Sequence, residues 1–305
     1  MAESVAAYGA PEREAGRRLG FEEAFFGGKA SVIEALGKTF ASVKEVGPQS
    51  WILRLRRTKG ACLSAHMLGE EWLILGGAAP GRSEIPWWRL IHRNAEIPAG
   101  VKFALLSPSR PYCLRSEICL DDGVDLARRL AEVRLGFERA SEEPSEPAKV
   151  ACTPSWPTSS REASEVRCLL EESGWQYSER SSGILAIDLR VSHGFYQALA
   201  EGWRDSGLRL RAEVAAFEAI PETCRGALGL LLLRSCGVLR LVRAVAHAGT
   251  GRVAVGLEAV FESLPTSGEM GHALSALSVA CGLLGSEVKV LQRDESIAAD
   301  YLRRW

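Results

Sequence analysis

The 305-residue sequence lacks a strong net charge, a long apolar run and the cysteine spacing of a disulfide framework. Its net charge of −1 gives no electrostatic case for a nucleic-acid or membrane partner. The longest strongly apolar run, 227–233, is too short to cross a bilayer. Residues 1–7 have neither the basic region nor the apolar core of a secretory signal. Eight cysteines in so long a chain are expected to be reduced and mostly buried. The sequence therefore predicts a cytoplasmic protein.

Patterns for catalysis, cofactor binding and metal binding are also sparse. Residues 26–31 contain Gly-Lys-x-Ser, but Glu23 and Ala30 stand where a phosphate-binding loop needs glycine and a hydroxyl. The cysteines do not form the two Cys-x2–4-Cys pairs that structural zinc prefers. No Gly-x-Ser-x-Gly or protease cysteine motif is present. We therefore expect no cofactor, no metal and no enzymatic activity. The alternative is an enzyme with a catalytic cysteine or histidine between two lobes, drawn from Cys224, Cys236, Cys281, His193, His247 and His272.

The strongest positive pattern lies between residues 238 and 291. Two β-rich runs, 238–246 and 252–261, flank a glycine-bearing turn and predict a β-hairpin. Thr266 and Glu269 then form a Thr-x-x-Glu capping box, which predicts a helix start. Apolar residues recur after it at alternating steps of four and three, so they share one helix face. They are Met270, Leu274, Leu277, Cys281, Leu284, Val288 and Leu291. Burying each large side chain contributes roughly 1.5–3 kcal/mol, so the helix needs a surface, and the hairpin is the natural one.

The same module occurs in the first half of the chain. The runs 101–107 and 112–120 predict a hairpin, and a helix with the same spacing follows. Its apolar positions are Leu126, Leu130, Val133 and Phe137. Internal repetition of this kind is a strong indication of architecture.

The whole chain can be divided into two such units. Residues 1–28 are expected to be a flexible tail, 29–140 the first lobe, 141–160 a proline- and serine-rich linker, and 161–305 the second lobe. Helices are expected at 29–43, 86–94 and 161–173, from 220–221, and at 296–305. Strands are expected at 51–57, 61–68, 72–77, 175–180, 184–191, 195–203 and 208–217. The predicted fold class is α+β, with two repeated lobes that each contain a twisted antiparallel sheet backed by helices.

This order resembles the type III secretion chaperone fold, which is shared with the YbjN-like family. The second half carries the stronger resemblance, in the 183–188 strand, the leucine-rich 227–234 helix, Gly256-Leu-Glu258, the 273–281 helix and 294–298. The resemblance implies non-enzymatic work: an adaptor, chaperone or regulator that binds an extended or partly unfolded segment of another protein. Such chaperones act as homodimers, so tandem copies could form an intrachain pseudo-dimer.

Arginines alternate with apolar residues on several expected strands, which indicates the solvent-facing side of a sheet. They are Arg54, Arg56, Arg57, Arg209, Arg211, Arg240 and Arg243. Solubility is the simpler explanation. A basic face for an acidic protein segment or a nucleic-acid strand is the alternative, and it would make this a nucleic-acid-associated accessory protein.

Tryptophan gives the best indication of a binding surface, because the chain has eight. Trp87 and Trp88 are adjacent on an expected helix, so both cannot face the core. One should lie near the surface, where tryptophan is enriched at binding hot spots, or between the lobes. The residues expected to contact a partner are Trp87, Trp88, Trp51, Trp72, Trp203 and Tyr196.

Overall fold

A computed structural model describes the chain in ten segments. They are residues 21–56, 61–79, 87–106, 112–121, 123–141, 161–180, 184–191, 194–204, 206–248 and 253–304. The expected tail up to residue 20 and the expected linker from residue 142 lie outside these segments.

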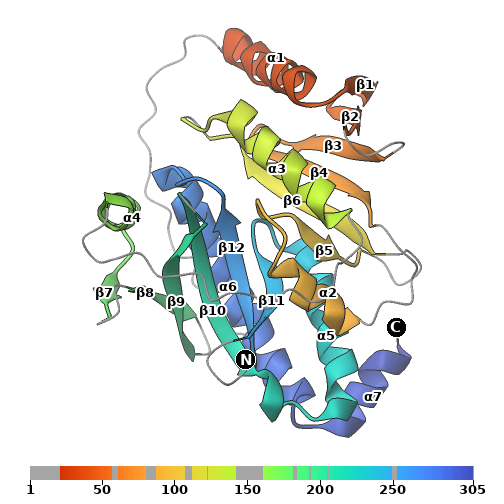
Figure 1. The fold of residues 1–305 in the computed structure, drawn as a ribbon, viewed down its shortest axis with the longest axis vertical. Coiled ribbons are helices and arrows are strands. Elements are labelled where there is room, and N and C mark those ends of the chain that lie inside the picture. The colour runs from red at the N-terminus through yellow and green to blue at the C-terminus, as the bar shows by residue number, and fades with distance from the viewer. Residues whose placement is uncertain are drawn as a thin grey trace, which may run out of the picture.

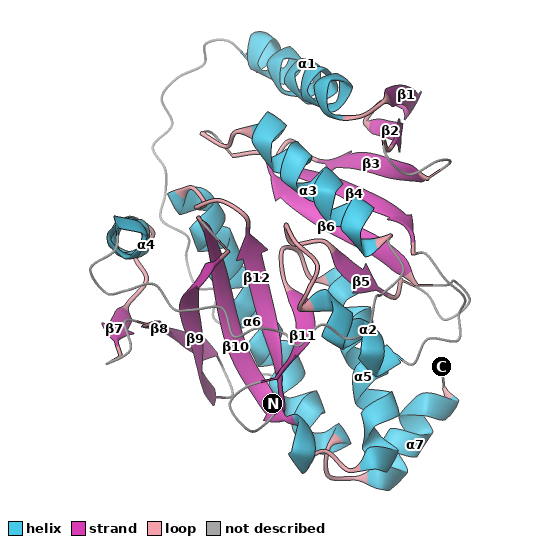
Figure 2. Cartoon of the chain, viewed as in Figure 1, coloured by secondary structure: helices cyan, strands magenta, loops and turns pink. Residues whose placement is uncertain are grey.

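Each half of the described chain has the same element order: helix, four strands, helix, two strands, helix (Figures 1 and 2). The first repeat contains α1 (Phe21–Thr39), β1 (Ser42–Gly47), β2 (Ser50–Arg54), β3 (Cys62–Leu68), β4 (Trp72–Ala78), α2 (Trp87–Asn94), β5 (Lys102–Ala104), β6 (Cys113–Cys119) and α3 (Leu126–Ala140). The second contains α4 (Arg161–Glu172), β7 (Tyr177–Glu179), β8 (Leu185–Val191), β9 (Gly194–Trp203), β10 (Gly207–Ala216), the 3-10 turn η1 (Phe217–Ala219), α5 (Glu222–Val238), β11 (Arg243–Ala248), β12 (Val253–Phe261), α6 (Ser267–Leu291) and the added α7 (Glu295–Arg303). The predicted α+β fold with two repeated antiparallel lobes is confirmed.

The two six-stranded sheets have the same topology. Sheet A runs β1-β2-β3-β4-β6-β5, and sheet B runs β7-β8-β9-β10-β12-β11. The pairing registers of the two sheets also match when Glu117 of sheet A is aligned with Glu258 of sheet B. Glu117 pairs with Ile74, and Glu258 pairs with the corresponding Arg211. The match continues through β3 and β2 of sheet A and through β9 and β8 of sheet B. The repetition expected from the sequence therefore extends to single positions.

One face of each sheet is covered by helices. Helix α3 packs on sheet A beside α1, and α6 packs on sheet B beside α4. The capping box of α6 is present, with Thr266 accepting from the Glu269 amide, and all seven residues of its predicted stripe are buried. By length and composition alone α6 could span a membrane, but this stripe is in the hydrophobic core. We call the opposite face of each sheet its outer face.

Two expected boundaries were wrong. The first helix begins at Phe21 and ends at Thr39, and residues 42–47 form the edge strand β1 instead of a helix end. Pairing of Ala41 N–H with the Arg54 carbonyl marks the change. Similarly, α5 continues to Val238, so β11 begins at Arg243 rather than at residue 238. The run 229–233 is buried along consecutive positions, and such burial on all sides stabilises the helix beyond what periodicity predicts.

The two repeats contact each other in a reciprocal way. Helix α2 of the first repeat packs on β11 of the second, and α5 packs on β5, with α2 against α5 (Figure 1). At the centre, Asn94 Oδ1 accepts from the Phe103 amide, and Cys236 Sγ accepts from the Ala244 amide in the same way. Asn94 and Cys236 also lie against each other, with 4.0 Å between Nδ2 and Sγ.

A buried ion pair from each repeat completes this interface. Lys102 lies 2.9 Å from Glu117, and Arg243 lies 2.7 Å from Glu258, all four side chains being 0% exposed. Lys102 Nζ donates to the Val242 carbonyl of the second repeat, and Arg243 donates to the Val101 carbonyl of the first. Since a buried charge is tolerated only when paired and hydrogen-bonded, each pair requires the other repeat in place.

Candidate functional site

The arginines of the second repeat do not form the solvent-facing basic surface that their alternation suggested. Arg209 and Arg243 are buried, at 4% and 0% exposure. Arg209 and Arg211 both bind Glu201, and Arg243 binds Glu258. The alternation placed these side chains on the outer face of sheet B correctly, but neighbouring glutamates neutralise them there. Because these arginines already form ion pairs with glutamates, their charges are not available to a nucleic-acid strand.

Three of the aromatic residues expected at a binding surface lie in the protein interior. Trp51, Trp72 and Trp203 are 1%, 6% and 6% exposed. The Trp203 indole donates to Glu262 at 2.7 Å. Burial at this level leaves little of the three rings for a partner to contact.

Tyr196 lies between β9 and α6. A Cβ added at Gly285 would meet the Tyr196 hydroxyl oxygen at 1.8 Å, so the glycine leaves room for the ring. Burial raises the pKa of Tyr196. The tyrosine therefore packs within the second repeat.

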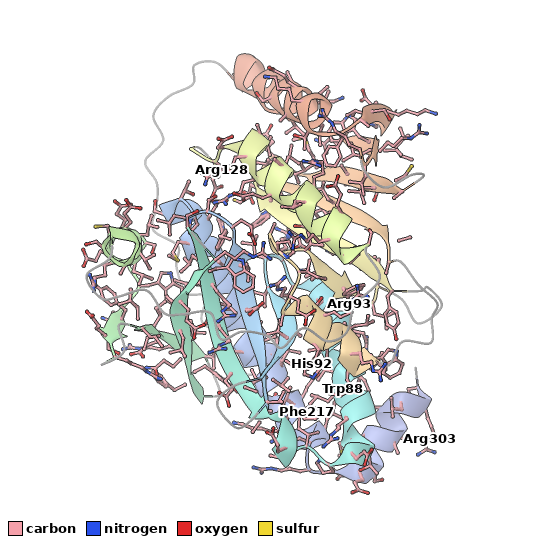
Figure 3. The ribbon with its side chains drawn as sticks, viewed as in Figure 1. Trp88, His92, Arg93, Arg128, Phe217 and Arg303 are labelled. Atoms are coloured by element: carbon pink, nitrogen blue, oxygen red, sulfur yellow. The ribbon has the colours of Figure 1, made fainter. Side chains whose placement is uncertain are left out.

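Trp87 and Trp88 lie at the contact between the two repeats. The Trp88 ring stacks on Phe217 of the second repeat, with 4.5 Å between centroids and 13° between planes. Figure 3 shows Trp88 and His92 beside Phe217. Gly229 of α5 lies so close that an added Cβ would be 3.4 Å from the Trp87 Cβ. Both rings are half-buried, which matches the alternative in which this pair packs between lobes.

The outer face of sheet A presents a different surface. It carries the exposed side chains of Ile52, Cys62 and His66 and the half-buried Ser64 and Ile74. A hollow of about 610 Å³ lies over β2, β3, β4 and β6. Its lining includes Ile52, Cys62, Ser64, His66, Ile74, Gly76, Ala78, Leu106, Cys113 and Arg115. Most of these groups are small or apolar, so this face can accept an apolar group closely.

Local contacts fix the polar groups of this face. Ser50 Oγ lies 2.8 Å from His66 Nδ1 across the β2–β3 ladder. Ser64 Oγ donates to the Gly76 carbonyl at 3.2 Å. Arg115 forms an ion pair with Glu117. These contacts hold the polar side chains in place around an apolar centre made by Ile52 and Ile74.

The free outer edges of the two sheets are poorly suited to accept another strand. Strand β1 carries Lys44 and Glu45 and has a register shift between Glu45 and Gly47. Lys29 of α1 also binds Glu45 at 2.8 Å. Strand β7 has three residues. Charge, bulges and shortness are the usual protections of an edge strand, so the outer face of sheet A offers the better docking surface.

Buried thiols bear on the enzyme alternative. Burial raises the pKa of Cys236, and it raises the pKa of Cys281 to about 12. Burial likewise raises the pKa of Cys119 to about 12, together with its hydrogen bond to Asp121. A nucleophilic cysteine needs a lowered pKa to present its thiolate. The environments of these three thiols favour the neutral form.

Comparison with known proteins gives no relative. No family model matches the chain, and neither a curated protein nor a solved structure is significantly similar to it.

The sequence contained one signal for the outer face of sheet A. Cys62 and His66 lie four apart on an expected strand and so share a face, as the structure bears out. What could not be foreseen is that Ile52 and Ile74, on the two neighbouring strands, complete the same surface through the ladder.

Proposed function

We propose that this protein is a non-enzymatic adaptor, chaperone or regulator that binds a segment of another protein. The docking surface is the outer face of sheet A. One observation carries this proposal: Ile52, Ile74 and Leu106 line an open hollow on this face, with Ile52 42% exposed and Leu106 53% exposed. An exposed apolar patch of this kind, rimmed by polar groups, is typical of a protein–protein contact.

The chemistry of the hollow defines the segment it would take. Gly76, Ala78 and Ser64 have small side chains, so an apolar residue of the partner can lie close to the sheet. His66 and Arg115 at the sides use Nδ1 and Nε for their contacts with Ser50 and Glu117, and their other nitrogens can donate to the partner's carbonyl or carboxylate oxygens. An extended or partly unfolded segment with alternating apolar side chains would satisfy both features.

The rest of the molecule holds this surface in place. The reciprocal contacts between the repeats support an intrachain pseudo-dimer, in which each repeat takes the part of one protomer. The seven cysteines of the described segments are unpaired, and this supports a reducing, cytoplasmic location.

The test uses charged substitutions on the outer face. The tagged full chain is first used to recover a partner from its own host, and the partner is then purified. Ile52→Asp and Ile74→Asp should each weaken its affinity more than tenfold, since apolar contacts at the centre of an interface dominate binding energy. Circular dichroism and thermal melting must show that both variants remain folded.

Phe195→Asp is the matched control. Phe195 is 61% exposed on β9, at the position of sheet B that corresponds to Cys62. Its substitution should leave the affinity unchanged. Folded Ile52→Asp and Ile74→Asp proteins that bind with wild-type affinity would refute the proposed surface.

A further inference from the structure

Among the described residues, Cys119, Asp121 and His272 bring together three side chains that can bind metal. One ligand atom from each lies within 4.8 Å of the other two. His272 Nε2 is 3.0 Å from Asp121 Oδ2. Cys119 ends β6 and Asp121 follows it in the first repeat, whereas His272 lies in α6 of the second. The cluster thus joins the two repeats, and none of its three residues lines the hollow on the outer face of sheet A.

We propose that these three residues bind a divalent cation of the zinc class. A thiolate, an imidazole and a carboxylate are the donors that zinc takes in proteins, and three protein ligands with one open position form a recognised arrangement. Zinc ligands in a tetrahedral site lie about 3.3–3.8 Å apart, given metal–ligand distances of about 2.0–2.3 Å. Side-chain movements of about 1 Å would close the present cluster to that size. On binding, the thiol proton of Cys119 leaves to solvent and the sulfur binds the cation as thiolate.

The surroundings of the cluster combine a buried thiol with two partly exposed ligands. Cys119 is buried at 1% exposure, while the side chains of His272 and Asp121 are 44% and 31% exposed, which leaves an entry path. The Trp72 and His272 rings pack in a T-shaped arrangement, with 5.4 Å between centroids. Arg240 in turn lies over Trp72 at 5.1 Å. These contacts restrict the orientation of the imidazole.

A hollow in the first repeat also reaches Asp121, one member of the cluster. Asp121 is part of the lining of a space of about 470 Å³, which Val32, Met67 and Leu126 also line. Asp121 further lies against the first turn of α6, where a Cβ added at Gly268 would be 2.9 Å from its Oδ2. The carboxylate is therefore held between the repeats with one side open to solvent.

No sequence pattern predicts this site. Cys119 and Asp121 are separated by one residue, but His272 follows about 150 residues later in a different repeat, so no ligand spacing exists. The three side chains meet because α6, which carries His272, lies beside the end of β6, where Cys119 and Asp121 are located.

The experiment uses the full chain, stripped of metal and kept reduced without added thiols. Zinc is titrated in competition with a chromophoric chelator, and Co²⁺ is added separately because a cobalt–thiolate bond gives a charge-transfer absorption band. We expect about one ion per chain and this band. Bound zinc should raise the melting temperature, since it binds the native state only and holds the two repeats together.

Two variants and two matched controls decide the outcome. Cys119→Ser should abolish the cobalt band, and His272→Gln should weaken zinc binding about tenfold or more, a loss in the range of metal-site perturbations. Cys113→Ser, on the same face of the same strand, and His66→Gln, at another exposed histidine, should bind as the wild type does. Lack of zinc binding at micromolar concentration would overturn the proposal, as would a cobalt band that survives in Cys119→Ser.

Discussion

At matching ladder positions, sheet A carries Ile52, Ile74 and Gly76 where sheet B carries Asp188, Arg211 and Glu213. The backbone geometry of the two outer faces is the same, yet one face is apolar and the other is charged. In sheet B the charges bind one another across neighbouring strands, as Arg209 and Arg211 do with Glu201. The fold can therefore keep its register while the outer face changes its chemistry, and the face left apolar is the one available to a partner.

The two repeats carry equivalent ion pairs at the interface between them. Lys102 with Glu117 and Arg243 with Glu258 occupy corresponding positions, and each cation also binds a carbonyl of the other repeat. The difference between the repeats thus lies on the strands away from the interface. This separates residues that hold the repeats together from residues that could bind a partner.

The largest effect is expected from removing the acid of a buried ion pair. Glu258→Ala leaves Arg243 charged and buried without its carboxylate, which costs about 3–5 kcal/mol. Glu117→Ala should act in the same direction in the first repeat, because Lys102 loses its partner. Denaturant-induced unfolding measures the effect as a lower midpoint. Glu45→Ala, which removes an exposed ion pair, is the control and should change stability by about 0–1 kcal/mol.

The next effect concerns binding rather than stability. Ile74→Arg gives sheet A the residue that sheet B has at this position. The half-buried side chain can reach solvent, so the variant should stay folded. Partner affinity should fall by about 2 kcal/mol or more, as expected for a residue at an interface centre. Isothermal titration with the purified partner measures this, and unchanged affinity would show that the apolar chemistry of sheet A is not used.

A smaller effect is expected between the repeats at Trp88. Trp88→Ala removes a ring stacked on Phe217. Such a contact contributes about 0.5–1.5 kcal/mol beyond the burial of area, so the melting temperature should decrease. Partner affinity should not change, because the ring faces the other repeat. Loss of affinity without loss of stability would instead assign Trp88 to the partner surface.

The last effect is negligible at neutral pH and appears on the alkaline side of the pH profile. Burial raises the pKa of Cys281 and of Tyr112 to about 12, from ordinary values of 9.0 and 10.0. Between pH 9 and pH 12 the unfolded chain loses protons that the folded chain keeps, so stability must fall as the pH rises, by up to about 1.4 kcal/mol per pH unit for each group. Cys281→Ala should make this decline less steep than in the wild type. An unchanged slope in the folded variant would contradict the burial argument.

The sequence predicted the repeat because its signals are local. Thr266 and Glu269 cap α6, and the spacing from Met270 to Leu291 defines its buried face. Such patterns depend on neighbours within one element. The edge strand β1 was missed because Val43 continued a helical spacing, and pairing with β2 decides its conformation instead.

The candidate surface was harder to predict because it depends on contacts between elements. Trp51 and Trp203 were expected at a surface as large aromatic residues, but their strand positions place them in the interior. Arg243 was expected in solvent, and only the approach of the other repeat buries it. Ile52 and Ile74 had no distinguishing local pattern, since the ladder alone unites them on one face.

Site-specific photo-crosslinking can show directly whether the partner binds the outer face of sheet A. A photoreactive residue is placed at position 52 on sheet A in one protein and at the corresponding position 188 on sheet B in another. Each is irradiated with the purified partner, and the crosslinked segment is identified by mass spectrometry. We expect one defined partner segment crosslinked from position 52 and none from position 188. Crosslinking from position 188 alone, or from both positions equally, would contradict this expectation.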